Sequence, residues 1–267
     1  MKHRIHLAVL LLLATTSLAD TGPLGFGDSA LETSMKTDRP DFTEGTHTIQ
    51  AGHLQIESGY TYTKRKDGLS EEDTGTFPEL LLRIGTAKDF ELRFTWVGYI
   101  NNQSNTEKDS SGLSNVSFGM KQTIVEGTES LFDLGYILEL GLPTGDSSVS
   151  SDKLEPVLKF LWSSELANDF SLGGNLNIAS VSAESDRVNE YSYSVSLGTS
   201  LTDICGTYLE IFGIIPEDNK NLADSHFING GFTYLLNSNF QLDVRAGFGL
   251  NRASDDLILG AGFSWRV

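Results

Sequence analysis

Apolar and polar residues alternate in twelve segments between about residue 53 and the end of the sequence. In the first segment, Leu54, Ile56 and Tyr60 share one parity, and Gln55 and Glu57 share the other. A two-residue period is typical of β-strands with two chemically different faces. The alternation predicts an all-β chain with strands within residues 53–62, 79–84, 90–96, 115–121, 132–140, 155–162, 170–178, 191–198, 208–212, 228–234, 240–248 and 257–266.

Segment lengths favour a membrane barrel over a soluble sandwich. Most segments approach the roughly 9–11 residues that a membrane strand needs, whereas soluble strands average about 5–6. Long polar connections are expected after the odd strands, at 63–76, 101–112, 143–154, 181–189, 215–226 and 251–256. Short turns are expected after the even strands, at 86–89, 125–130, 163–169, 201–205 and 237–239. This layout predicts a transmembrane antiparallel up-and-down β-barrel of about 12 strands.

Aromatic residues near the strand ends agree with the interfacial girdles of such barrels. They also have a simpler explanation, because aromatic side chains favour β-strands in general. The residues in question are Tyr60, Tyr62, Phe90, Trp96, Trp162, Phe170, Tyr191, Phe240 and Trp265.

The N-terminus reads as a secretory signal peptide spanning residues 1–19. Lys2 and Arg4 precede an apolar run, and Ser17-Leu18-Ala19 resembles a cleavage site. We expect residues 20–50 to form a periplasmic N-terminal segment that is a possible lumen plug, and residues 51–267 to form the barrel. The predicted location is the bacterial outer membrane, with both termini periplasmic.

Composition narrows the function classes. Without residues 1–19 the chain has 17 Lys and Arg against 36 Asp and Glu, a formal charge of −19, so nucleic-acid binding is not expected. The single cysteine, Cys205, excludes an intramolecular disulfide. No segment after residue 19 is apolar enough for a membrane-spanning helix, so membrane insertion requires a closed barrel.

Several motifs resemble a known family. They are Thr37-Asp38-Arg39-Pro40-Asp41-Phe42-Thr43, Gly52–Tyr60, Gly112–Ser114, Gly119–Lys121, Leu142–Asp146, Gly231–Tyr234, Gln241–Arg245 and Gly260–Arg266. Together they span most of the chain after residue 36, which is similar to a family of outer-membrane transporters named for the MetA pathway of phenol degradation. The resemblance implies a barrel with a transport role and brings no catalytic residues.

The end of the last strand carries a second resemblance. Gly260, Phe263 and Trp265 precede the final Val267 and resemble the C-terminal signal that the barrel-assembly machinery recognises. The expected partners are accordingly that machinery, outer-membrane lipid with lipopolysaccharide, and a small-molecule solute.

Charged residues of the polar parity are expected to face the lumen. They either line a pore and set its selectivity, or fill and rigidify the lumen through paired charges. The expected lumen-lining residues are Glu57, Glu79, Arg83, Glu91, Arg93, Glu139, Lys159, Glu210, Asp243, Arg245 and Arg266.

The segment 37–43 precedes the first strand and carries Asp38, Arg39 and Asp41. Pro40 argues against a central strand here. The segment is expected to lie in the lumen as a plug or along the periplasmic rim. A structural role, with Arg39 pairing with lumen carboxylates, is favoured over a gating role.

Catalytic, metal and cofactor chemistry is not expected. The histidines after residue 19 are His47, His53 and His226, and their spacing is not that of metal ligands. His226 beside Ser225 is the one candidate for catalysis at a lipid-facing surface. The acidic run Glu71-Glu72-Asp73 reads as a solvated loop face, with cation bridging to lipopolysaccharide as the less favoured reading.

Two functions follow for a barrel of this kind. The favoured one is a passive channel or transporter for small solutes, aromatic or hydrophobic ones included. The alternative is a non-conducting structural or surface-interaction barrel. A soluble periplasmic β-protein is a third possibility, which fractionation with the outer membrane would exclude.

Overall fold

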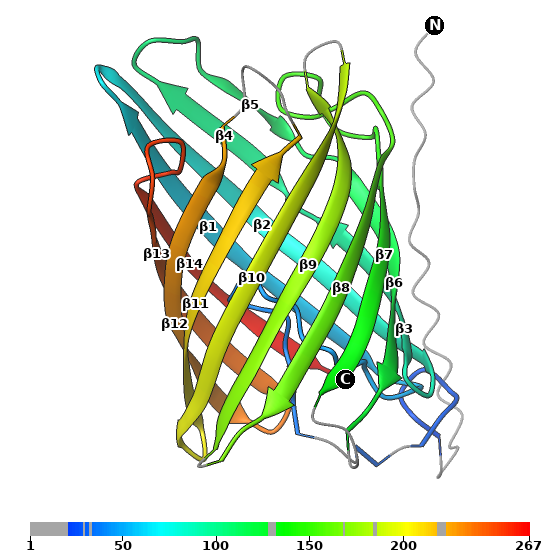
Figure 1. The fold of residues 1–267 in the computed structure, drawn as a ribbon. Helices are drawn as coiled ribbons and strands as arrows, with labels where there is room; N and C mark the ends of the chain where they lie inside the picture. Colours follow the sequence, from blue (N-terminus) through cyan, green and yellow to red (C-terminus); the bar gives the residue numbers. More distant parts are fainter. Residues whose placement is uncertain are drawn as a thin grey trace, which may run out of the picture.

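The computed structural model describes residues 21–28, 30–31, 34–127, 132–167, 169–183, 186–217 and 223–267. The expected signal peptide lies outside these residues. The described strands form a closed antiparallel barrel, as the alternation predicted (Figure 1). No helix in the described part of the chain is long and apolar enough to cross a membrane.

The barrel wall follows the order of the chain. Within the described residues its strands are β1 (Leu54–Asp67), β2 (Ser70–Ala87), β3 (Phe90–Trp96), β4 (Tyr99–Ser104), β5 (Ser110–Leu113), β6 (Val116–Val125), β7 (Asp133–Leu142), β8 (Glu155–Glu165), β9 (Phe170–Ala183), β10 (Asp186–Thr202), β11 (Cys205–Pro216), β12 (Ser225–Asn237), β13 (Phe240–Gly249) and β14 (Leu257–Arg266). β1 pairs with β14 from Gln55–Arg266 to Lys64–Leu257, which closes the ring.

Two of the barrel's strands are interrupted. β3 and β4 both pair with β2, and their partners across the next hairpin are β6 and β5. Gly98 stands at the first interruption with a φ of 89°, and its carbonyl accepts a hydrogen bond from Ser114 N at 2.8 Å, at the second. Counting β3 with β4 and β5 with β6 gives the predicted 12-stranded barrel.

Three of the expected long loops are wrong. Residues 63–76 are mostly paired strand, because β1 continues to Asp67 and β2 starts at Ser70. The same holds for 101–112, where β4 pairs with β5, and for 181–189, where β9 pairs with β10. These hairpins read as loops because both of their faces are polar, which removes the alternation while leaving backbone pairing possible.

The two faces of the wall have the expected chemistry. The outward face is apolar, with exposed side chains such as Leu92, Phe118, Phe160, Leu176, Leu209, Phe232 and Val244. The inward face holds side chains that are polar or charged and buried, among them Gln55, Glu57, Arg83, Glu91, Lys121, Asn175 and Glu210. The buried charged side chains require partners of opposite charge, because leaving one charge unpaired away from water destabilises the folded protein by several kcal/mol.

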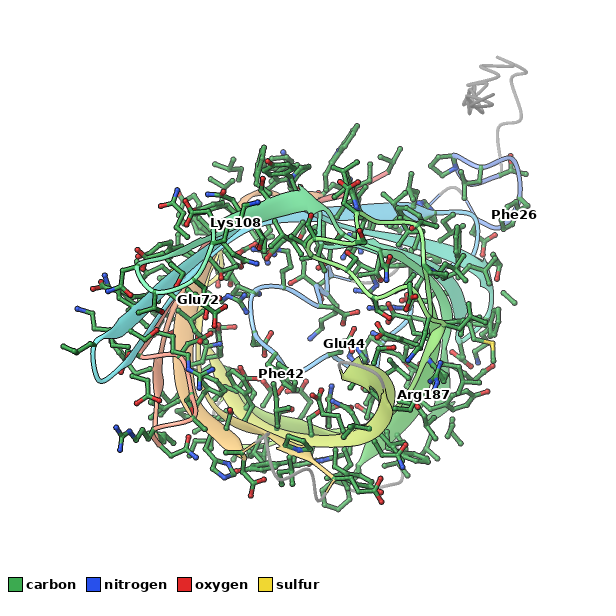
Figure 2. The ribbon with its side chains drawn as sticks, turned by 90° about the horizontal axis from the view of Figure 1, so that it is seen from above. Phe26, Phe42, Glu44, Glu72, Lys108 and Arg187 are labelled. Carbon is green, nitrogen blue, oxygen red and sulfur yellow. The ribbon has the colours of Figure 1, made fainter. Side chains whose placement is uncertain are left out.

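The N-terminal segment supplies many of those partners. Seen along the barrel axis, its chain runs inside the ring of strands, with Phe42 and Glu44 in the interior (Figure 2). It enters and leaves at the end of the barrel that carries the short turns, where Leu54 and Val267 exchange backbone hydrogen bonds of 3.1 and 2.7 Å. Residues 34–50 are called the lumen segment below.

Candidate functional site: the lumen and its segment

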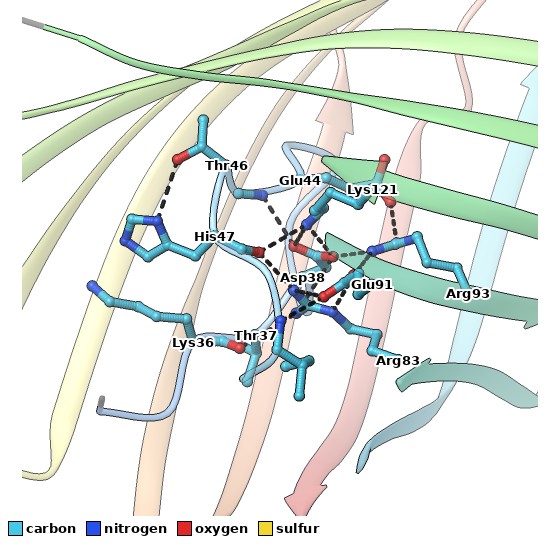
Figure 3. Close-up of polar contacts among 12 residues, drawn as sticks. Lys36, Thr37, Asp38, Glu44, Thr46, His47, Arg83, Glu91, Arg93 and Lys121 are labelled. Atoms are coloured by element: carbon cyan, nitrogen blue, oxygen red, sulfur yellow. Dashed lines mark hydrogen bonds and ion pairs between the residues drawn. The ribbon is translucent and has the colours of Figure 1, made fainter. Parts of the chain in front are cut away.

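Asp38 is the central ion-pairing residue of the lumen segment (Figure 3). Its carboxylate accepts hydrogen bonds from Lys121 Nζ at 2.8 and 3.0 Å and from Arg93 Nη1 at 2.7 Å. Arg83 Nη1 lies 3.5 Å away. Burial alone would raise the pKa of Asp38, but these three cations outweigh it and hold the pKa well below its ordinary value. Asp38 is therefore ionised and pins the lumen segment to β2, β3 and β6.

Three more carboxylates balance the same cations. Arg83 donates to Glu91 at 2.9 Å and to Glu57 at 3.1 Å. Arg93 donates to Glu91 at 2.8 Å and to Glu44 at 2.6 Å. Because each guanidinium contacts three carboxylates, Asp38 included, the pairs form one continuous network. We call this network the charged wall; its members are Asp38, Glu44, Glu57, Arg83, Glu91, Arg93 and Lys121.

Backbone groups of the lumen segment join this network. Glu57 accepts from the backbone N of Asp38 at 3.0 Å, and Glu91 accepts from that of Ile49 at 2.8 Å. Arg83 Nη2 donates to the carbonyl of His47 at 2.9 Å. The segment has no regular secondary structure, so these wall side chains satisfy backbone groups that would otherwise be buried without partners.

Two glycines allow the lumen segment to lie close against the inner face of the barrel wall. A Cβ at Gly85 would collide with the backbone carbonyls of Ile49 and Gln50. Similarly, a Cβ at Gly262 would lie 2.6 Å from Arg39 Nε. Arg39 runs over this glycine to reach Glu79 at 2.7 Å and Asp243 at 3.4 Å.

Hydrogen bonds and aromatic contacts hold the segment to the far side of the barrel, on β11 and β12. Glu210 accepts from the backbone N of Phe42 at 3.0 Å and of Thr43 at 2.6 Å. The ring of Phe42 stacks on Phe212 with centroids 4.5 Å apart, and Phe212 stacks on Phe227 at 4.7 Å. This aromatic stack lies on the long-loop side of Glu210, because β11 runs from a short turn toward the opposite end.

A cavity of about 390 Å³ lies between the lumen segment and the end of the barrel that carries the short turns. Much of its lining consists of small side chains on β9 to β12, and it reaches Glu165 and Asp169 at the turn between β8 and β9. We call the following set the small-residue wall: Ser171, Gly173, Ser196, Gly198, Gly206 and Thr233. Asp41 lines the same cavity and accepts a hydrogen bond from Ser196 Oγ at 3.3 Å.

Asp41 differs from Asp38 in its electrostatic surroundings. Burial, and next the negative charge of Glu210, raise the pKa of Asp41 well above its ordinary value. No ion pair of Asp41 occurs among the described residues. Within the lumen segment, the compensated carboxyl group of Asp38 thus lies three residues from the uncompensated one of Asp41.

The remaining residues expected in the lumen have smaller roles there. Glu139 lies 4.0 Å from Lys159, which also binds Glu44 at 2.6 Å. Arg245 donates to the carbonyl of Pro40 at 2.9 Å. Arg266 lies near the end of the chain and donates to the carbonyl of Ser34 at 3.3 Å.

The residues of the expected assembly signal lie on both faces of β14, the outward face and the lumen face. Trp265 is exposed on the outward face, and Phe263 stacks on Phe240 with centroids 5.7 Å apart. Gly260 faces inward, where Arg245 packs over it.

Two residues of the charged wall were not among the expected site residues. Lys121 has the inward parity of its strand, so alternation was a sufficient signal for it. Glu44 has no such signal, because it lies in a segment without a repeating pattern.

His226 forms no catalytic pair with Ser225. Its Nδ1 lies 3.1 Å from the hydroxyl of Tyr193, whereas Ser225 donates to the carbonyl of Ala253 at 3.3 Å. Neighbours on one strand point to opposite faces, which separates the two side chains.

The fold agrees with several solved structures. An outer membrane channel from Pseudomonas putida F1 matches with a TM-score of 0.66 and 12% identity, over 83% of this chain and 98% of that one. The NanC porin matches with 0.54 and 9%, over 80% and 100%, and the KdgM porin with 0.51 and 11%, over 79% and 98%. At these identities the matches show the fold alone, a β-barrel that this chain shares with solved outer-membrane proteins.

A family model identifies the chain more closely. The model described as "Putative MetA-pathway of phenol degradation" matches residues 37–267. The chain belongs to this family, as its motifs indicated. No curated protein matches the sequence.

Proposed function

We propose that this protein is a passive outer-membrane channel for small solutes, with the lumen segment as a fixed part of its wall. The observation that carries the proposal is the cavity of about 390 Å³ between the segment and the small-residue wall. It lies within a barrel whose other side is occupied by paired charges. The resemblance to solved channels and porins supports the same role.

Small aromatic or hydrophobic solutes are the proposed cargo. The aromatic stack of Phe42, Phe212 and Phe227 lies on the long-loop side of the cavity, where a solute arriving from outside would meet it. Phe212 and Phe227 are buried, so the half-buried ring of Phe42 is the part of the stack that offers such a solute a stacking contact. The family description, which names phenol degradation, agrees with this cargo.

The proposed orientation places the short turns and both chain ends in the periplasm. Outer-membrane barrels have short periplasmic turns and longer external connections. The solute would then pass the aromatic stack first, then Glu210 and Asp41, and finally the small-residue wall.

Liposome swelling tests both the passage and the solute class. We expect swelling with phenyl β-glucoside to be faster than with cyclohexyl β-glucoside, which has a similar size and no aromatic ring. Equal rates would contradict the aromatic preference. No swelling with either solute, and no current in planar bilayers, would contradict the channel and favour the non-conducting barrel.

A pair of variants on β9 tests the path. Gly173 faces the cavity, where a Cβ would be 3.4 Å from the nearest atom, while Leu176 is exposed on the outward face of the same strand. Gly173→Phe should fill the cavity and reduce flux several-fold, whereas Leu176→Phe should leave flux unchanged. Equal flux in the two variants would place the path elsewhere.

A further inference from the structure

The carboxyl groups of the lumen segment are not equally compensated. Asp38 and Glu44 each lie within 3 Å of lysine or arginine nitrogens, as Asp38 does with Lys121 at 2.8 Å and Glu44 with Lys159 at 2.6 Å. Asp41 has only the hydroxyl of Ser196 within hydrogen-bond distance among the described side chains. Its carboxylate therefore keeps acceptor capacity that the protein itself does not use.

Glu210, the acidic neighbour of Asp41, is satisfied in a different way. Besides the backbone donors of Phe42 and Thr43, it accepts hydrogen bonds from Thr43 Oγ1 at 2.6 Å and Asn229 Nδ2 at 3.0 Å. These donors are neutral, so they solvate the carboxylate without cancelling its charge. Glu210 consequently adds negative potential beside the cavity while having little capacity to bind anything further.

The lining of the cavity provides the rest of a cation-binding environment. Hydroxyl groups of Ser171, Ser196 and Thr233 border it, and each offers oxygen lone pairs. Glu165 and Asp169 add two carboxylates at its short-turn end. Three cationic side chains also border the cavity. Arg39 and Arg83 are already paired with carboxylates, so Lys36 is the cation that counteracts the negative potential of the cavity.

We propose that Asp41 and the hydroxyl groups around the cavity form a subsite for small cations, which gives the lumen a preference for cations over anions. The inference rests on the proposed channel for its role in transport, but the subsite itself exists whether or not the barrel conducts. Carboxylates in narrow, low-dielectric passages attract cations and repel anions, as acidic rings do in cation channels.

A cysteine reporter tests the subsite without requiring conduction. Ser171→Cys places a near-isosteric thiol on the small-residue wall, in a Cys205→Ser background that removes the native thiol. The probes are a cationic and an anionic methanethiosulfonate of similar size, applied to the refolded barrel in detergent. The measurement is the ratio of their modification rates, first with Asp41 and then with Asp41→Asn.

The expected result is that the cationic reagent reacts faster and that Asp41→Asn lowers the rate ratio several-fold at alkaline pH, where Asp41 is ionised, because the lost unit charge attracts one probe and repels the other. Glu72→Gln is the matched control, because Glu72 is an exposed carboxylate on the hairpin between β1 and β2. It should leave the ratio unchanged. The same ratio with and without the Asp41→Asn substitution would overturn the proposal.

Reversal potentials in a potassium chloride gradient then test the consequence for transport. Asp41→Asn should reduce the cation-to-anion permeability ratio, and Glu72→Gln should not. An unchanged permeability ratio in conducting barrels would overturn the selectivity. Wild-type barrels that pass no current would contradict the proposed channel, while the cysteine reporter still decides the subsite.

Discussion

The two sides of the lumen differ in how their polar side chains are accommodated. The charged wall on β1, β2, β3 and β6 pairs nearly every ionised group with an opposite charge and binds the lumen segment tightly. The small-residue wall on β9 to β12 carries hydroxyl groups and glycines and leaves a cavity. Charge pairing fills one side of the barrel, and small side chains keep the other side open.

Breaking the charged wall should have the largest effect. Asp38→Asn leaves Arg83, Arg93 and Lys121 without their shared counter-charge, and removing one partner from a buried ion-pair network costs about 3–5 kcal/mol. Urea unfolding in lipid vesicles measures the loss. Adding Lys121→Met to Asp38→Asn should restore part of the stability, and a double variant as unstable as the single one would contradict this account.

Adding a side chain at Gly85, where the lumen segment lies against β2, should destabilise the protein less. In Gly85→Ala the new methyl group meets the carbonyls of Ile49 and Gln50, and overpacking of this kind costs about 1–3 kcal/mol. Limited proteolysis should then cut the lumen segment faster. Gly75→Ala on the same strand is the control, because its Cβ would lie 3.4 Å from Tyr60. Equal cleavage of the two variants would show that the segment does not need this glycine.

Acidification should separate Asp38 from Asp41. Asp38 has a lowered pKa in the folded protein, so its stabilisation is present above the ordinary carboxyl pKa of about 4 and is lost as the pH falls through the folded value. Asp41 has a raised pKa, so the folded state gains stability as the pH falls through that higher value.

Comparison with the asparagine variants isolates the two contributions. Between about pH 7 and pH 5, the stability of wild type relative to Asp41→Asn should rise, while its stability relative to Asp38→Asn should stay constant. Unfolding free energies measured across this range test the pattern. A parallel response of both pairs would contradict the different electrostatic surroundings of the two aspartates.

The hairpin between β1 and β2 should show the smallest effect. Glu71 pairs with Lys64 near the turn of this hairpin, where both side chains are partly exposed and water screens the pair. Glu71→Gln should leave the melting temperature of the barrel unchanged. A clear loss of stability would mean that this hairpin supports the barrel more than its exposure suggests.

The sequence predicted the strands of the barrel wall better than the position of the lumen segment inside it. Alternation was sufficient to place Arg83 and Glu91 on a common face, because strand parity is a local property. It failed for residues 63–76, where both faces of the hairpin meet water and the pattern disappears.

The position of the lumen segment depends on contacts that no local pattern contains. Asp38 and Lys121 are 83 residues apart, and Thr43 and Glu210 are 167 apart. The charges of Asp38 and Arg39 indicated that the segment needs partners, but not which ones. The difference between Asp38 and Asp41 arises only when the barrel brings three cations to one and an acidic neighbour to the other.

Locking the lumen segment to the wall tests the central claim most directly. Thr46 Oγ1 lies 2.8 Å from Ser163 Oγ on β8, so Thr46→Cys with Ser163→Cys, in a Cys205→Ser background, is suited to form a disulfide there. The measurement is single-channel conductance before and after reduction. The account predicts the same conductance in both states, because solutes pass beside a fixed segment. Channels that are closed when locked and open on reduction would contradict it and show that the segment is a gate.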